Sequence, residues 1–160
     1  MPAFDASSML HAWDNYPERQ FPPLWNWIAR GIAARHITIP RVACDEVAHK
    51  APECADWLRH RNIEEYEVTN GITHHAVRIK GLLGIVGDNY HPKGVGENDL
   101  IIVATALVHG VELVSEEQRQ INPPQVAAKR KIPLVCAMAD VAVPCCSFIE
   151  YLKRSNEIFG

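Results

Sequence analysis

Apolar residues recur at helical spacing in several stretches of the sequence. Leu24, Ile28 and Ile32 repeat every four residues after two prolines, which predicts a helix from residue 21 to about residue 35. Further helices are predicted at residues 41–50, 53–61, 70–86 and 147–154. Helices therefore account for much of the predicted structure.

The run from Leu100 to Val108 is apolar on all sides, so its pattern fits a buried helix and a buried strand alike. Asn98 offers an N-cap, the alanines inside the run favour a helix, and Gly110 stands where a C-cap belongs. We therefore predict a buried helix here, followed after a tight turn by a strand at residues 111–114.

Short strands are predicted between several of these helices. Phe4 closes a very short opening strand, and Ser7 and Ser8 cap a brief helix after it. Two more strands are predicted at residues 37–39 and 66–68. Strands that alternate with helices predict an α/β fold with a short parallel central sheet flanked by helices. In such sheets, ligands bind beyond the carboxyl ends of the strands.

The 160 residues suit a single domain, 1–160, because no repeat, linker or charge block divides them. Sixteen basic and nineteen acidic side chains leave a net charge of −3, which excludes a histone-like nucleic-acid binder. Contact with nucleic acid must then come from a local basic patch or from bound cations. Lys129, Arg130 and Lys131 form such a patch and are predicted to bind phosphate, with a solvated loop as the alternative.

The cysteines and the N-terminus point to the cytoplasm. Five cysteines is an odd number and none forms a C-x-x-C pair, which favours reduced thiols over disulfides or a zinc site. The N-terminus has neither the basic start nor the apolar run of a signal peptide. The longest apolar stretch is far short of the ~20 residues of a membrane span, so no membrane association is expected.

Four acidic residues are predicted to face the same edge of the sheet. Asp5 and Glu117 come just after strands, Glu46 lies in a helix that follows a strand, and Asp99 lies in the first turn of the buried helix. Carboxylates that converge repel one another, so such a cluster makes physical sense if it binds a hard cation such as Mg²⁺ or Mn²⁺. Surface solvation and helix capping are the alternatives.

Six segments, in this order along the chain, carry a resemblance to a known family. Four of them contain the acids: Phe4-Asp5-Ala6-Ser7, Asp45-Glu46-Val47, residues 99–107, and Val114-Ser115-Glu116-Glu117. They resemble the four acidic motifs of PIN-domain ribonucleases. The other two, residues 21–27 and 131–136, are similar to a PIN-like branch described only as a domain of unknown function.

The resemblance implies a role for each matched residue. Asp5, Glu46, Asp99 and Glu117 match the catalytic, metal-binding acids, while Ser7 and Ser115 match small polar residues at the substrate site. Glu117 stands where the better-known branch more often carries Asp, which leaves open whether it binds metal directly or through water. The opening strand is shorter than in the family, which predicts a less rigidly held Asp5.

The resemblance further implies an activity. Members of the PIN family are Mg²⁺- or Mn²⁺-dependent endoribonucleases, and many, as in the VapC group, are the toxin of a bacterial type II toxin–antitoxin pair. RNA and a protein antitoxin are the implied partners, with a homodimer as a further option. Two alternatives stay open: a non-catalytic PIN-like module that binds protein, and a DNA nuclease or phosphatase that uses the same acids.

Overall fold

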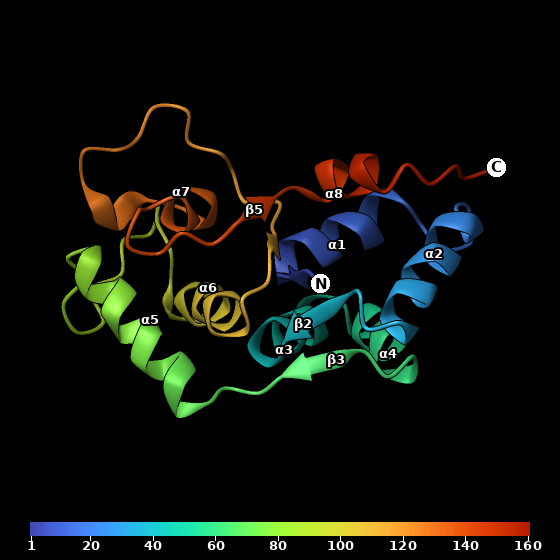
Figure 1. Ribbon diagram of the computed structural model, residues 1–160, viewed down its shortest axis with the longest axis horizontal. Helices are drawn as coiled ribbons and strands as arrows, with labels where there is room; N and C mark the ends of the chain where they lie inside the picture. The colour runs from blue at the N-terminus through green and yellow to red at the C-terminus, as the bar shows by residue number, and fades with distance from the viewer.

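The computed structural model describes residues 1–160 as five short strands and eight α-helices (Figure 1). The strands are β1 (Ala3–Phe4), β2 (Thr38–Pro40), β3 (Glu64–Tyr66), β4 (Leu113–Val114) and β5 (Cys145–Cys146). The helices are α1 (Ala6–Asn15), α2 (Pro22–Ala33), α3 (Arg41–Lys50), α4 (Pro52–His60), α5 (Asn70–Leu82), α6 (Glu97–His109), α7 (Ile132–Cys136) and α8 (Phe148–Ser155), with a 3₁₀ turn, η1 (Ala127–Lys129), before α7.

The five strands form one parallel sheet in the order β3-β2-β1-β4-β5. The central strand β1 pairs Ala3 with Thr38 of β2 on one side and with Leu113 of β4 on the other. The predicted α/β class with a short parallel sheet is therefore confirmed. Its central strands are buried on both faces, as is expected when helices flank a parallel sheet.

The arrow of β3 in Figure 1 ends on the side where α5, α6 and α7 lie. Because all the strands are parallel, this side is the carboxyl edge of the whole sheet. Helices α1 and α3 begin at this edge, directly after β1 and β2, and run back along the sheet. The first residues of α1 and those just after β4 therefore meet at one edge.

Several predicted elements have different ends in the structure. The N-cap of α1 is Asp5 rather than Ser7 or Ser8, because the Asp5 carboxylate accepts from the Ser8 backbone N at 2.8 Å. The N-cap of α6 is Gly96 rather than Asn98. Val68 lies outside β3, and β5, α7 and η1 were not predicted at all.

One continuous core joins both faces of the sheet to the helices. Trp25, Phe4, Phe148 and Met9 are among its largest side chains that are almost fully buried. All five cysteines are free thiols, and four of them are buried. No helix combines the length and the apolar character needed to cross a membrane.

The loop before α6 packs tightly against η1. A Cβ at Gly94 would collide with the carbonyl oxygen of Ala128, so only glycine fits there. We expect Gly94→Ala to lower the free energy of unfolding by about 2 kcal/mol, as for other overpacked positions. Gly81→Ala is the control: nothing lies near its Cβ, and alanine favours a helix. Urea unfolding measures both, and equal stability of Gly94→Ala and wild type would contradict the contact.

Candidate active site

Asp5 is the most buried of the four predicted acids and the hub of a hydrogen-bond network. It is 2% exposed, directly after β1. Ser7 Oγ donates to both carboxylate oxygens, at 2.8 and 2.9 Å, and Ser115 Oγ donates to Oδ2 at 2.6 Å. The Ser8 backbone N donates to Oδ1. The prediction that Asp5 is loosely held is wrong. Although β1 is short, the hydroxyl groups of Ser7 and Ser115 hold the Asp5 carboxylate in place.

The two serine hydroxyls also connect Asp5 to the chain after β4. Each hydroxyl donates to Asp5 and accepts from a backbone amide: Ser7 Oγ accepts from Glu116 N at 2.9 Å, and Ser115 Oγ from Glu117 N at 3.2 Å. The predicted polar residues Ser7 and Ser115 therefore fix the position of the segment that carries Glu117. This is a structural role, and contact with substrate stays a prediction.

Burial dominates the titration of Asp5. Removal from water raises the pKa of its carboxyl to about 6, against an ordinary value of 3.8, although the hydrogen bonds from Ser115, Ser8 and Ser7 oppose this. Groups whose pKa is strongly shifted by burial are concentrated at functional sites, so the raised pKa makes Asp5 a candidate functional residue.

Asp99 lies in the first turn of α6, where it has a structural and an electrostatic role. Its Oδ2 accepts from the Gly96 backbone N at 2.9 Å, which is one half of a capping box. Burial raises the pKa of Asp99, and the negative charges of Glu117 and Glu46 raise it further. Glu46 and Glu117, from distant parts of the sequence, thus lie close enough to Asp99 for their charges to act on it.

Glu46 and Glu117 each face a lysine. Lys50 Nζ lies 3.5 Å from Glu46 Oε1, one helical turn along α3, and Lys131 Nζ lies 3.8 Å from Glu117 Oε2. Both glutamates are about one-third exposed, so these pairs are weak. Asn98 and Glu46 line the same small cavity, together with Val42, Asp45 and His49.

The structure brings Glu46 and Glu117 within electrostatic reach of Asp99, and Ser115 ties Asp5 to the segment that carries Glu117. As the side chains stand, however, no three carboxylate, imidazole or thiol groups form a set that could hold a metal ion. The donors themselves are oxygens only, the type that Mg²⁺ and Mn²⁺ prefer. The donor chemistry therefore fits a hard divalent cation, and binding of one stays a prediction.

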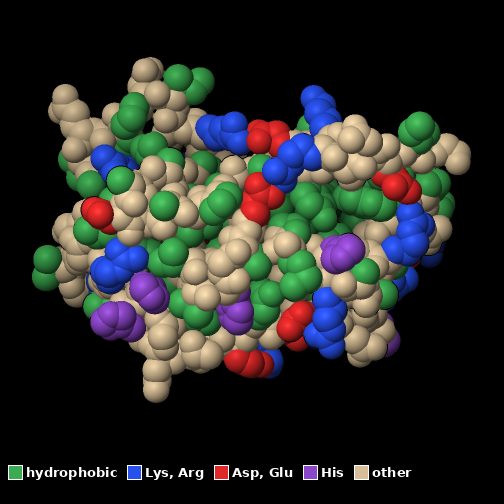
Figure 2. Space-filling view, viewed as in Figure 1, with side chains coloured by type: hydrophobic (Ala, Val, Ile, Leu, Met, Phe, Trp, Pro, Cys, Tyr) green, Lys and Arg blue, Asp and Glu red, His purple; other side chains and the backbone are tan.

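The basic segment 129–131 is not a solvated loop. All three of its residues are half-buried, and the Arg130 carbonyl oxygen accepts from Val95 N at 3.0 Å. Arg130 Nε is buried without a hydrogen-bond partner. Figure 2 shows basic and acidic side chains side by side on the face that it draws, in keeping with the small net charge.

Two further residues at this edge have contacts that the sequence pattern does not indicate. Gln120 bridges two backbone groups of the basic segment, and Glu116 Oε1 accepts from the Phe148 backbone N at the start of α8. Glu116 Oε2 also lies 3.9 Å from His11 Nδ1. Only its place next to Glu117 could have drawn attention to Glu116, and nothing in the sequence marks Gln120.

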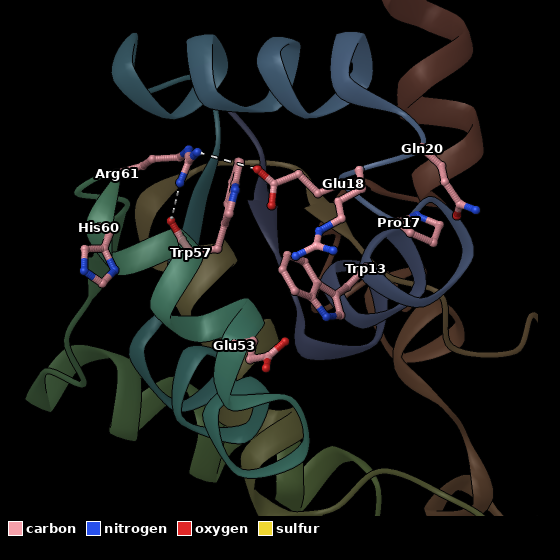
Figure 3. Close-up of a pocket in the computed structure, with 9 residues that line it drawn as sticks. Trp13, Pro17, Glu18, Gln20, Glu53, Trp57, His60 and Arg61 are labelled. Atoms are coloured by element: carbon pink, nitrogen blue, oxygen red, sulfur yellow. Dashed lines mark hydrogen bonds and ion pairs between the residues drawn. The ribbon is translucent and has the colours of Figure 1, made fainter.

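A cavity of about 780 Å³ lies elsewhere, between α4 and the end of α1 with the loop that follows it (Figure 3). The Arg61 guanidinium stacks over the Trp57 ring at 3.7 Å and pairs with Glu18 at 3.9 Å. Trp57 and Trp25 are buried, while Trp13 is half-buried in the cavity wall. None of the predicted site residues lines this cavity.

Fold and site together define an α/β protein with an acidic cluster at the carboxyl edge of a parallel sheet. Residues 3–159 match the family described as "Domain of unknown function (DUF4411)", so the chain belongs to that family. Membership of a family described only as a domain of unknown function is confirmed, whereas the PIN-like relationship of that family and the nuclease activity stay predictions.

One solved structure of low similarity is titled "Crystal structure of VapBC2 from Rickettsia felis bound to a DNA fragment from their promoter". It shares 13% sequence identity with a TM-score of 0.49, over 81% of this chain and 96% of that chain. No curated protein sequence matches this chain.

Proposed function

We propose that this protein is a Mg²⁺- or Mn²⁺-dependent endoribonuclease, the toxin of a type II toxin–antitoxin pair. The observation that carries the proposal is the approach of Glu46 and Glu117 to Asp99 at the carboxyl edge of the sheet, close enough for both charges to raise the pKa of Asp99. Repulsion among these groups offers the fold no advantage, whereas a cation would turn it into attraction.

Each residue then has a task. Asp99, Glu46 and Glu117 would hold the cation, and Asp5 would join them or hold Glu117 in place through Ser115. A divalent ion bound there supplies Lewis-acid stabilisation of the negative charge that develops on the phosphoryl group. Lys129, Arg130 and Lys131 would bind the phosphates of the RNA on either side of the cleaved bond.

The substrate and the partner rest on the motif resemblance. The order and residue types of the four acidic motifs support RNA as substrate and a protein antitoxin as partner.

A second function, a non-catalytic module that binds protein, has one observation in its favour. Lys50 and Lys131 already pair with two of the four acids, and no three acids form a metal-binding set in the positions seen here. In such a module Glu46 and Glu117 would serve only as partners of these lysines.

Expression in bacterial cells separates the two functions. We expect the wild-type chain to arrest growth and degrade total RNA, and Glu46→Gln to abolish both effects, because it removes a charge that the cation needs. Asp45→Asn is the matched control: Asp45 precedes Glu46 on α3 but pairs with Arg59 and Arg41 on the surface. Equal growth arrest by wild type and Glu46→Gln, at equal protein levels, would favour the binding module.

A further inference from the structure

The basic segment is fastened to the chain after β4 by one side chain. Gln120 Nε2 donates to the Lys129 carbonyl oxygen at 2.9 Å, and Gln120 Oε1 accepts from the Lys131 backbone N at 2.7 Å. One amide thus uses both of its ends on the two residues that flank Arg130. The segment cannot shift relative to Gln120 without breaking both hydrogen bonds.

The other side of the segment is fastened to the loop that leads into α6. Val95 N donates to the Arg130 carbonyl oxygen at 3.0 Å, and Gly94 lies against the Ala128 carbonyl with no room for a side chain. Helix α6, which carries Asp99, begins two residues after Val95. The basic segment is therefore held between the segment that carries Asp99 and the segment that carries Glu117.

This double attachment brings the Lys131 ammonium to the acidic cluster. Its Nζ lies 3.8 Å from Glu117 Oε2, and its positive charge also acts on Asp99. The Lys131 side chain is only 29% exposed, whereas that of Lys50 beside Glu46 is 58% exposed. Lys129 forms no ion pair, although it carries the same charge two residues away.

We propose that Lys131 is a built-in counter-ion of the acidic cluster, held there by Gln120 as a positioning residue, and that it competes with the divalent cation for Glu117 and Asp99. The inference rests on the proposed function in one respect, because it takes these carboxylates as the cation site. Lys131 then regulates that site, because the divalent cation must displace the Lys131 ammonium from the carboxylates before it binds to them.

Coulomb's law gives the size of the effect. A single positive charge at about 6 Å from a divalent cation, in a water-like dielectric, weakens its binding by about tenfold. Since the site is partly exposed, salt should screen the interaction and reduce the difference between wild type and variant.

The test is calorimetric titration of Mn²⁺ into the full-length protein in the absence of RNA. We expect Lys131→Met to bind Mn²⁺ about tenfold more tightly than wild type, and Lys129→Met to stay within about twofold. Gln120→Ala should also tighten Mn²⁺ binding, because it frees Lys131 to move away. In the Lys131→Met background the same Gln120 substitution should have no effect, since it acts through the lysine.

The outcomes are distinct. Suppose that wild type binds Mn²⁺ and cleaves RNA, but Lys131→Met binds Mn²⁺ no more tightly than wild type. This result overturns the inference and leaves the proposed function intact. Equal gains from Lys131→Met and Lys129→Met also overturn it, because they reflect overall charge. If neither wild type nor any variant binds Mn²⁺, both the inference and the proposed function fail. A Gln120→Ala variant that only loses thermal stability shows that Gln120 is merely structural.

Discussion

Asp99→Asn is expected to slow RNA cleavage by about a hundredfold or more, because it removes a charged ligand of the proposed cation. The same substitution should change the free energy of unfolding by no more than about 0.5 kcal/mol in chelator. The asparagine oxygen still accepts from Gly96 N, so the cap of α6 is preserved while the repulsion from Glu46 and Glu117 disappears.

Asp99→Ala is the matched variant, because it removes the charge and the cap together. We expect it to be as inactive as Asp99→Asn but less stable by about 1 kcal/mol. Activity is measured on a labelled RNA with Mg²⁺, per folded molecule, and stability by urea unfolding. If Asp99→Asn is as destabilised as Asp99→Ala yet cleaves at the wild-type rate, Asp99 is a capping residue only.

Asp5→Asn is expected to gain stability relative to wild type as the pH of the metal-free protein rises from acid to neutral, on top of a constant cost from an amide nitrogen where Asp5 Oδ2 accepts from Ser7 and Ser115. The folded-state pKa of Asp5, about 6, lies above its ordinary value of 3.8, so the folded protein binds a proton more readily than the unfolded chain. The ionised carboxylate therefore destabilises the fold above pH 6. This cost disappears as the pH falls from 6 to 4. The difference between a pKa of about 6 and one of 3.8 corresponds to a cost of about 3 kcal/mol in the free energy of unfolding.

Unfolding in urea with chelator at pH 7.5 and pH 4.5 measures this effect. We expect the difference in free energy of unfolding between Asp5→Asn and wild type to shrink by about 2–3 kcal/mol at the lower pH. Other titrating groups, Asp99 included, are present in both proteins and cancel in the difference. If the difference in free energy of unfolding between Asp5→Asn and wild type does not depend on pH, the ionised Asp5 carboxylate does not destabilise the fold.

The sequence predicted the fold where local signals are strong. Pro40 ends a strand and opens α3, so its bounds at Arg41 and Lys50 were predicted correctly. Strand β5 has two residues and α7 has five, which is too short for either to show a period. The cap of α6 was misplaced because the side chain of Asp99 reaches back to Gly96, so that the helix begins before Asn98.

The candidate site was predicted only in part. The four acids were found from their places near strand ends and from the motif resemblance, and the structure brings Glu46 and Glu117 within electrostatic reach of Asp99. The lysines that face Glu46 and Glu117 and the double hydrogen bond of Gln120 were not foreseen. Lys131 and Gln120 meet across loops without periodic structure, and only the folded chain brings such residues together.

Cleavage of a labelled RNA by the purified wild-type protein tests the central claim most directly. We expect endonucleolytic products with Mg²⁺ or Mn²⁺, none with chelator, and at least about a hundredfold slower cleavage by Asp99→Asn of equal stability. Cleavage that persists in chelator, or no cleavage by folded wild type with either cation, would contradict it.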